Sequence, residues 1–155
     1  MNLESELKQK QFNTAGERVM VNILYTAYRI NDHLACILSP YKISVQQYNI
    51  LRILRGQYPS CASVILLKER MIDKNSGVSR LVEKLRLKGF IERKVNENDR
   101  RQVDVKILPA GLKALKEIDQ KILLFHRSAR ISRHKNLNSI NTFLDTLRTN
   151  LKSSF

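Results

Sequence analysis

The stretch VSRLVEKLRLKGFIER, residues 78–93, decides the fold predicted for this chain. Apolar residues in its first half recur at the three- and four-residue spacing of one helix face. Gly89 follows, at the position where a left-handed residue commonly ends a helix. The pattern then takes the period of a strand from Phe90 to Val95. We therefore expect a short amphipathic helix followed directly by a strand, and the inward residues of the helix are Val78, Leu81, Val82 and Leu85.

Downstream, a second strand is predicted to pair with the first. Apolar and polar residues alternate strictly over residues 102–107, with Val103, Val105 and Ile107 on one face. The intervening residues 96–101 are polar and charged, which is typical of a hairpin tip. The sequence therefore predicts a two-stranded hairpin with a charged loop.

Upstream, two further helices are expected. Ser44 and Gln47 form the pattern of a capping box, so a helix should run from there to about Arg55. The spacing of apolar residues over 63–71 predicts a second, shorter helix. Residues 73–77, DKNSG, are rich in capping and turn-forming residues and mark the start of the next helix. Helix, turn, helix and hairpin is the order of a winged helix-turn-helix domain.

Both ends of the chain are predicted to be helical. Residues 4–38 read as one long helix that Gly16 weakens or bends, and residues 109–130 and 137–151 read as two more. These helices carry long apolar stripes, and a compact middle domain can bury only part of them. We expect the stripes to pair two copies of the chain, with self-packing in one copy as the alternative. The predicted fold is mainly α, with domains 1–40 (dimerisation helix), 41–108 (winged helix-turn-helix) and 109–155 (dimerisation helices).

The charge of the chain narrows the classes of partner that it is expected to bind. It has 155 residues, with 28 Lys and Arg against 14 Asp and Glu, for a net charge of +14. Such an excess favours a polyanion, either nucleic acid or an acidic membrane surface. The start of the chain is polar, and no apolar run is long enough to span a bilayer, so we expect a cytoplasmic protein.

Motifs of other functional classes do not stand out. Cys36 and Cys61 lie too far apart for a metal-type pair and are too few for a disulfide framework. The three histidines lack metal-ligand spacing. No phosphate loop, nucleophile motif or pair of catalytic carboxylates stands out, so we expect no enzyme, no metal and no cofactor.

The predicted helix beginning at residue 78 has the chemistry of a DNA-reading element. A helix fits the major groove, and its amino end presents free N–H groups to phosphates. Small hydrogen-bonding side chains cluster at this helix start, and a cation follows one turn later. The hairpin adds further cations. These residues are Asn75, Ser76, Ser79 and Arg80 on the helix, and Arg93, Lys94, Arg100 and Arg101 on the hairpin.

Four segments in order resemble the MarR family of bacterial transcription regulators. Residues 47–54 (QYNILRIL) resemble the second helix of that family, and residues 78–93 resemble its recognition helix and first wing strand. Residues 98–103 (NDRRQV) resemble the tip of its wing, and residues 107–111 (ILPAG) the start of the next helix. The resemblance covers roughly residues 44–115. It implies a homodimer with interlocking first and last helices and two DNA-binding lobes. Many members are repressors released by phenolic or lipophilic ligands or by cysteine oxidation.

The resemblance also assigns roles to residues. Asp99 would brace Arg101, and Arg101 would enter the minor groove. The chain departs from the family at Gly77, where Thr or a similar residue is usual, and at Leu108, where a capping Thr is usual. The complete set of candidate DNA-binding residues is Asn75, Ser76, Ser79, Arg80, Lys84, Arg93, Asp99, Arg100 and Arg101.

Some of these residues have a plainer interpretation. Arg100 and Arg101 also fit an ordinary solvated loop. Arg80 could instead pair with Glu83, three residues along the same helix, for a few tenths of a kcal/mol.

Residues outside the DNA-binding set also carry expectations. Cys36 is expected to be a buried, inert thiol and Cys61 to serve plain packing, with redox sensing as the alternative. Tyr25, Tyr28 and Tyr48 are candidates for a ligand pocket between the first helix and the DNA-binding lobe, or else core aromatics.

The sequence thus predicts a homodimeric, sequence-specific DNA-binding regulator. We expect a repressor that binds a pseudo-palindromic operator and responds to a small aromatic or lipophilic effector, with no membrane partner. Two rival functions remain open. One is a nonspecific architectural DNA-binding protein, and the other is a helical protein-interaction module that does not bind DNA.

Overall fold

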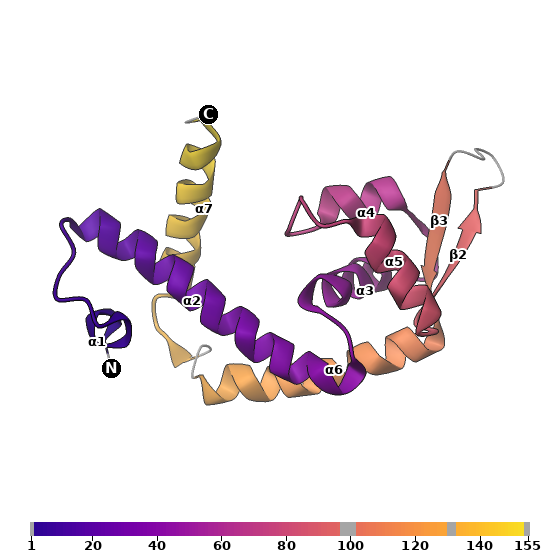
Figure 1. The fold of residues 1–155 in the computed structure, drawn as a ribbon, viewed down its shortest axis with the longest axis horizontal. Coiled ribbons are helices and arrows are strands. Elements are labelled where there is room, and N and C mark those ends of the chain that lie inside the picture. Colours follow the sequence, from indigo (N-terminus) through magenta and orange to yellow (C-terminus); the bar gives the residue numbers. More distant parts are fainter. Residues whose placement is uncertain (1, 97–101, 130–132, 154–155) are drawn as a thin grey trace. The chain divides into compact units, whose positions relative to one another are not determined.

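The computed structural model describes residues 2–96, 102–129 and 133–153. The chain divides into two compact units, residues 1–118 and residues 119–155. It is mainly helical with a small antiparallel sheet (Figure 1), which confirms the predicted winged helix-turn-helix architecture. The elements are α1 (Leu3–Leu7), α2 (Ala15–Leu38), η1 (Ser39–Tyr41), α3 (Val45–Gln57), β1 (Ala62–Ser63), α4 (Val64–Arg70), α5 (Val78–Leu87), β2 (Ile91–Val95), β3 (Val103–Ile107), α6 (Pro109–Ser128) and α7 (Leu137–Ser153).

The amino-terminal region forms two helices, so the prediction of one helix over residues 4–38 is wrong. Lys8 ends α1 in a left-handed conformation, with φ of 52°. Thr14 then starts α2 by accepting a hydrogen bond from the Glu17 backbone N–H at 3.0 Å. Because its side chain caps one of the first N–H groups, Thr14 begins a new helix instead of lying inside a longer one. An ion pair between Arg18 and Glu4 at 2.6 Å joins α1 to α2.

The helix-turn-helix begins at the predicted capping box, which is confirmed. The Gln47 backbone N–H donates to the Ser44 hydroxyl at 3.2 Å, and the Ser44 backbone N–H donates to the Gln47 side chain at 3.1 Å. Ser63 caps α4 in the same way, by accepting from the Leu66 N–H at 3.1 Å. α5 begins after Gly77 without a side-chain cap. The core of the winged helix-turn-helix lobe includes fully buried residues from several elements: Ile50, Leu51 and Leu54 of α3, Leu67 of α4, Leu85 of α5, and Val105 of β3.

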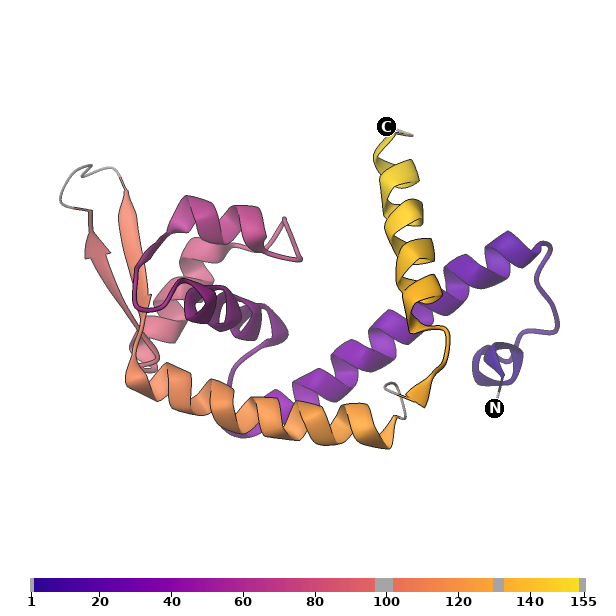
Figure 2. The same ribbon diagram turned by 180° about the vertical axis from the view of Figure 1, so that it is seen from behind.

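The sheet has three strands in the order β1-β3-β2, where the sequence predicted two. The expected hairpin is present, because β2 and β3 pair antiparallel with Arg93 opposite Val105. The additional strand β1 is only two residues long and pairs with β3 through Ala62 and Ser63. A segment that short has no periodicity to detect. From both sides, the β2–β3 hairpin lies beside α5 (Figures 1 and 2).

The start of α6 packs closely against the base of the hairpin. A Cβ atom on Gly111 would lie 2.5 Å from the Phe90 carbonyl oxygen and 2.8 Å from Ile107 Cγ1. The same Phe90 carbonyl accepts a hydrogen bond from the Leu108 N–H at 3.0 Å. Only glycine allows this approach, so Gly111 fixes how α6 leaves the hairpin.

Candidate nucleic-acid interface

Hydrogen bonds hold residues 72–76 in place at the amino end of α5. The Asp73 carboxylate accepts from the Asn75 N–H at 3.0 Å, and the Asp73 carbonyl accepts from the Ser76 hydroxyl at 2.7 Å. The Ile72 N–H donates to the Asn49 side chain at 3.0 Å, which ties the segment to α3. Asn75 and Ser76 are thereby held at the start of α5, where the first N–H groups of a helix have no partner within it.

α5 has one buried side and one exposed, basic side. Val78, Val82 and Leu85 are buried, as the spacing predicts, and Leu81 is half-buried. The exposed residues include Asn75 in the preceding segment and Ser79, Arg80 and Lys84 on the helix, whereas Ser76 is half-buried. Packing therefore fixes the direction in which these predicted contact residues face.

Glu83 does not neutralise Arg80. It pairs instead with Arg86 at 2.8 Å and with Arg93 of β2 at 3.9 Å. The hydrogen bond from Arg86, with the nearby charges of Arg86 and Arg93, lowers the pKa of the Glu83 carboxyl below its ordinary value. Within the described residues, Arg80 and Lys84 are exposed and make no ion pair, so no described carboxylate neutralises either charge.

The hairpin places another cation near the start of α5. A hollow of about 260 Å³ is lined by Ser79 of α5, Arg93 of β2 and the first residues of α4. Ser63 and Ile65 from the amino end of α4 also line it, and Ile65 is 59% exposed. Sequence reasoning did not single out these two residues, because only the fold brings α4 against the hairpin.

Three predicted contact residues, Asp99, Arg100 and Arg101, lie outside the described residues. Hydrogen bonds join the described residues of the hairpin on either side of this segment. The Asn96 N–H donates to the Gln102 carbonyl at 3.1 Å, and the Asn96 side chain donates to Asp104 at 2.8 Å. The two described residues on either side of that segment, Asn96 and Gln102, thus lie next to each other.

The three tyrosines proposed for a ligand pocket lie in different surroundings. Tyr28 lines a cleft between α2 and the winged helix-turn-helix lobe. Tyr25 lines a separate, polar hollow and donates its hydroxyl to Glu6 at 2.7 Å. Tyr48 is buried, only 6% exposed, with the Arg52 guanidinium 5.7 Å from the centre of its ring.

Both cysteines are exposed, so the expectation of a buried Cys36 thiol is wrong for a single chain. The expectation assumed that α2 is covered around Cys36, but Leu38 is the only buried residue of that helix, all of which the structure describes. Among the described residues, no group of three or more His, Cys, Asp or Glu side chains is arranged to hold a metal ion. None of the described helices has the length and apolar character required to cross a membrane.

Comparison with known proteins supports the family resemblance. Residues 43–103 match the model of the MarR family, which confirms the resemblance predicted from the sequence. Two curated relatives, each named multiple antibiotic resistance protein MarR, come from Salmonella typhimurium and Salmonella typhi. Each is 32% identical over 84 residues, which are 54% of this chain and 57% of the relative. The chain thus spans little more than half the length of the curated relatives it matches.

Solved structures extend the similarity to nearly the whole chain. AbsC, a MarR family transcriptional regulator from Streptomyces coelicolor, matches with a TM-score of 0.76 and 18% identity, over 93% of this chain and 99% of that one. A MarR transcription factor from Planctomyces limnophilus matches with a TM-score of 0.67 and 24% identity, over 90% of this chain and 99% of that one. The chain therefore has the fold of MarR transcription regulators.

Proposed function

We propose that this chain, whose residues 43–103 match the MarR family, binds double-stranded DNA sequence-specifically as a homodimer and represses transcription. The observation that carries the proposal is the exposed side of α5, where Arg80 and Lys84 have no ionic partner among the described residues. A short helix with one face packed on its domain and a basic face outward is suited to the major groove.

Contacts in this arrangement divide between bases and phosphates. Asn75, Ser76 and Ser79 at the start of α5 have the side chains that hydrogen-bond to base edges or phosphate oxygens. Arg80 and Lys84 attract the phosphate backbone, as does the net charge of +14. The wing supplies Arg93 and, at its tip, Arg100 and Arg101. Within the tip, Asp99 is proposed to brace Arg101 for entry into the minor groove.

Uncovered apolar side chains support the homodimer. On α2, Met20, Leu24 and Ile30 are 41%, 67% and 42% exposed. In the second unit, Ile140 and Phe143 of α7 are 43% and 49% exposed. Apolar faces of this extent favour a protein partner, and a second copy of the chain offers the same faces. A dimer would carry two α5 helices and so read two half-sites of a pseudo-palindrome.

Repression and release by an effector complete the proposal. A bound dimer blocks access to the DNA that it covers. A small-molecule effector acts only if it binds the free and DNA-bound conformations with different affinities. The cleft beside Tyr28, at the junction of α2 and the DNA-binding lobe, is the best-placed candidate for such a site.

Replacing Arg80 by alanine is expected to weaken DNA binding by about 5- to 150-fold, the worth of one good contact at roughly 1–3 kcal/mol. Arg80 is exposed and makes no ion pair with any other described residue, so its removal leaves the core intact. Fluorescence anisotropy with a labelled duplex selected by the protein itself measures the change.

Lys116→Ala is the matched control, because it also removes one exposed positive charge, from α6. We expect it to change the affinity less than about threefold, since an exposed charge away from the interface acts only through a screened field. Equal losses for the two variants would contradict the assignment of α5 as the contact helix.

A further inference from the structure

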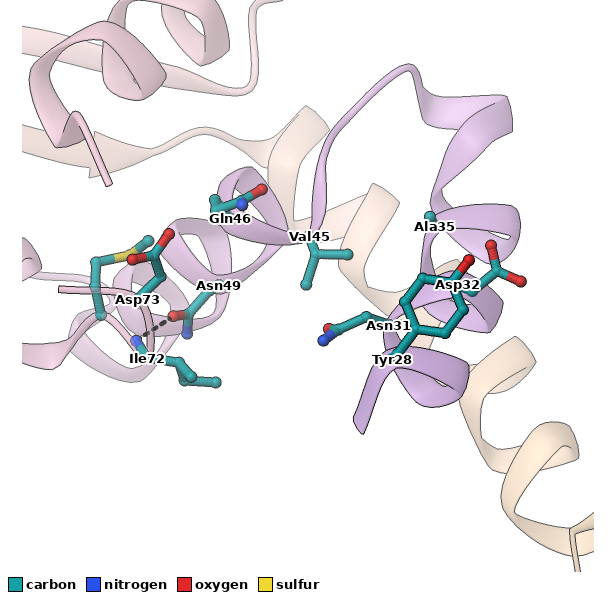
Figure 3. A pocket seen from close by; sticks show the side chains of 10 residues that line it. Tyr28, Asn31, Asp32, Ala35, Val45, Gln46, Asn49, Ile72 and Asp73 are labelled. Carbon is teal, nitrogen blue, oxygen red and sulfur yellow. Dashed lines mark hydrogen bonds between the residues drawn. The ribbon is translucent and has the colours of Figure 1, made fainter. Parts of the chain in front are cut away.

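A cleft of about 560 Å³ lies between α2 and the DNA-binding lobe. Figure 3 shows Tyr28 and Asp32 of α2 on one side, and Asn49 of α3 with Ile72 and Asp73 on the other. All of its lining residues belong to the first compact unit. Its volume is in the range of small-molecule sites in proteins.

The charge of this cleft opposes the charge of the chain. Its described lining contains two carboxylates, Asp32 and Asp73, and no lysine or arginine, in a protein of net charge +14. The Asp73 carboxylate accepts one hydrogen bond, from the Asn75 N–H, and neither aspartate forms an ion pair with any residue that the structure describes. The lining therefore provides negative charge that no side chain of the cleft balances.

The remaining walls suit an organic rather than a hydrated inorganic cation. Ala35, Val45 and Ile72 contribute apolar surface, and Ile72 is 83% exposed. The Tyr28 side chain is 64% exposed, which leaves its ring accessible. The face of an aromatic ring attracts ammonium groups, and more strongly when they are desolvated.

We propose that the cleft binds an organic cation, an amine or quaternary ammonium group attached to an apolar body. The proposal refines the effector class of the proposed function and rests on that function only for its effect on DNA. An anionic ligand would be repelled by the two aspartates. An anion would instead favour the adjoining hollow that is lined by Arg52 and Arg55 and shares Asn49 and Ile72 with the cleft.

The wall of the cleft continues directly into the DNA-contacting residues. Asp73 holds Asn75 and Ser76 through the hydrogen bonds described above, and Asn49 holds Ile72. A ligand against Asp73 and Asn49 thus contacts the segment that positions the start of α5. Occupation of the cleft changes DNA affinity through this segment, and DNA changes cation affinity by the same factor.

Isothermal titration calorimetry of the full chain without DNA tests the binding step, with benzyltriethylammonium as the probe. Benzoate serves as the anionic control and benzyl alcohol as the neutral one. Asp32→Asn and Asp73→Asn should each weaken cation binding about threefold, and the double variant about tenfold, as expected for partly exposed charges. Asp73→Asn keeps a side-chain oxygen that accepts the Asn75 hydrogen bond, which preserves the turn. Glu117→Gln on α6 removes a carboxylate outside the cleft and should leave cation binding unchanged.

Each outcome of these titrations decides the proposal. Cation binding that exceeds benzoate and benzyl alcohol binding, and that falls in the aspartate variants, supports it. No cation binding, tighter binding of benzoate, or full binding by the double variant overturns it. The titrations contain no DNA, so they fail or succeed independently of the proposed function. In a separate DNA titration, saturating cation should shift wild-type affinity at least fivefold, and an unchanged affinity would overturn the coupling.

Discussion

Raising the salt concentration from about 50 to about 200 mM is expected to reduce the DNA affinity of this protein by roughly 10³-fold or more. The estimate applies to a protein that contacts about 6–10 phosphates, because each contact releases condensed counterions. The chain has an excess of positive charge that can make these phosphate contacts, with 28 Lys and Arg against 14 Asp and Glu. Arg80 and Lys84 contribute directly, since no described acidic residue pairs with either of them.

Anisotropy titrations of one labelled duplex at four or more salt concentrations measure the slope. Arg80→Ala should lower the magnitude of the slope by about one if Arg80 contacts a phosphate. An affinity that hardly changes with salt would exclude phosphate-led binding. That outcome would favour the rival function of a helical protein-interaction module.

Placing a charge on the exposed apolar face of α2 is expected to abolish the dimer. Leu24 is 67% exposed in the single chain, and an aspartate there would have to be buried without a partner in a dimer that uses this face. The binding of two half-sites would then lose its intramolecular advantage. The affinity for a pseudo-palindromic duplex should fall about 10²- to 10⁴-fold.

Sedimentation velocity and duplex titration together test this expectation. Thr26→Asp is the matched control, because it adds the same charge to an exposed position of α2 about 200° around the helix from Leu24. We expect Thr26→Asp to remain dimeric. A wild-type protein that sediments as a single protomer, or a Leu24→Asp variant that stays dimeric, would contradict the proposed interface.

Local signals in the sequence were sufficient to predict the winged helix-turn-helix lobe. The capping box at Ser44 and Gln47 starts α3 as predicted, and Gly89 adopts the left-handed conformation that ends α5, with φ of 71°. The spacing of Val78, Val82 and Leu85 determined which side of α5 is buried. These features depend on neighbouring residues alone, so periodicity and capping chemistry reveal them.

Features that depend on distant contacts could not be predicted in the same way. The Arg18–Glu4 ion pair joins α1 to α2 across the turn, and β1 exists only because β3 pairs with it. Glu83 pairs with Arg86 of its own helix and with Arg93 rather than with Arg80, and the pair with Arg93 forms because β2 lies beside α5. The cleft combines residues from α2, α3 and the segment after α4, so its two aspartates had no shared signal in the sequence.

Selection of DNA from a random pool tests the central claim most directly, namely that paired α5 helices read specific sequence. The full chain is allowed to enrich fragments, and its affinity for the enriched duplex is compared with its affinity for scrambled duplex at the same salt concentration. We expect a pseudo-palindrome with half-site centres about one helical turn apart and a preference of about 10³-fold or more over scrambled DNA. A pool without a common motif, bound as tightly as scrambled duplex, would contradict the account and indicate a nonspecific architectural protein.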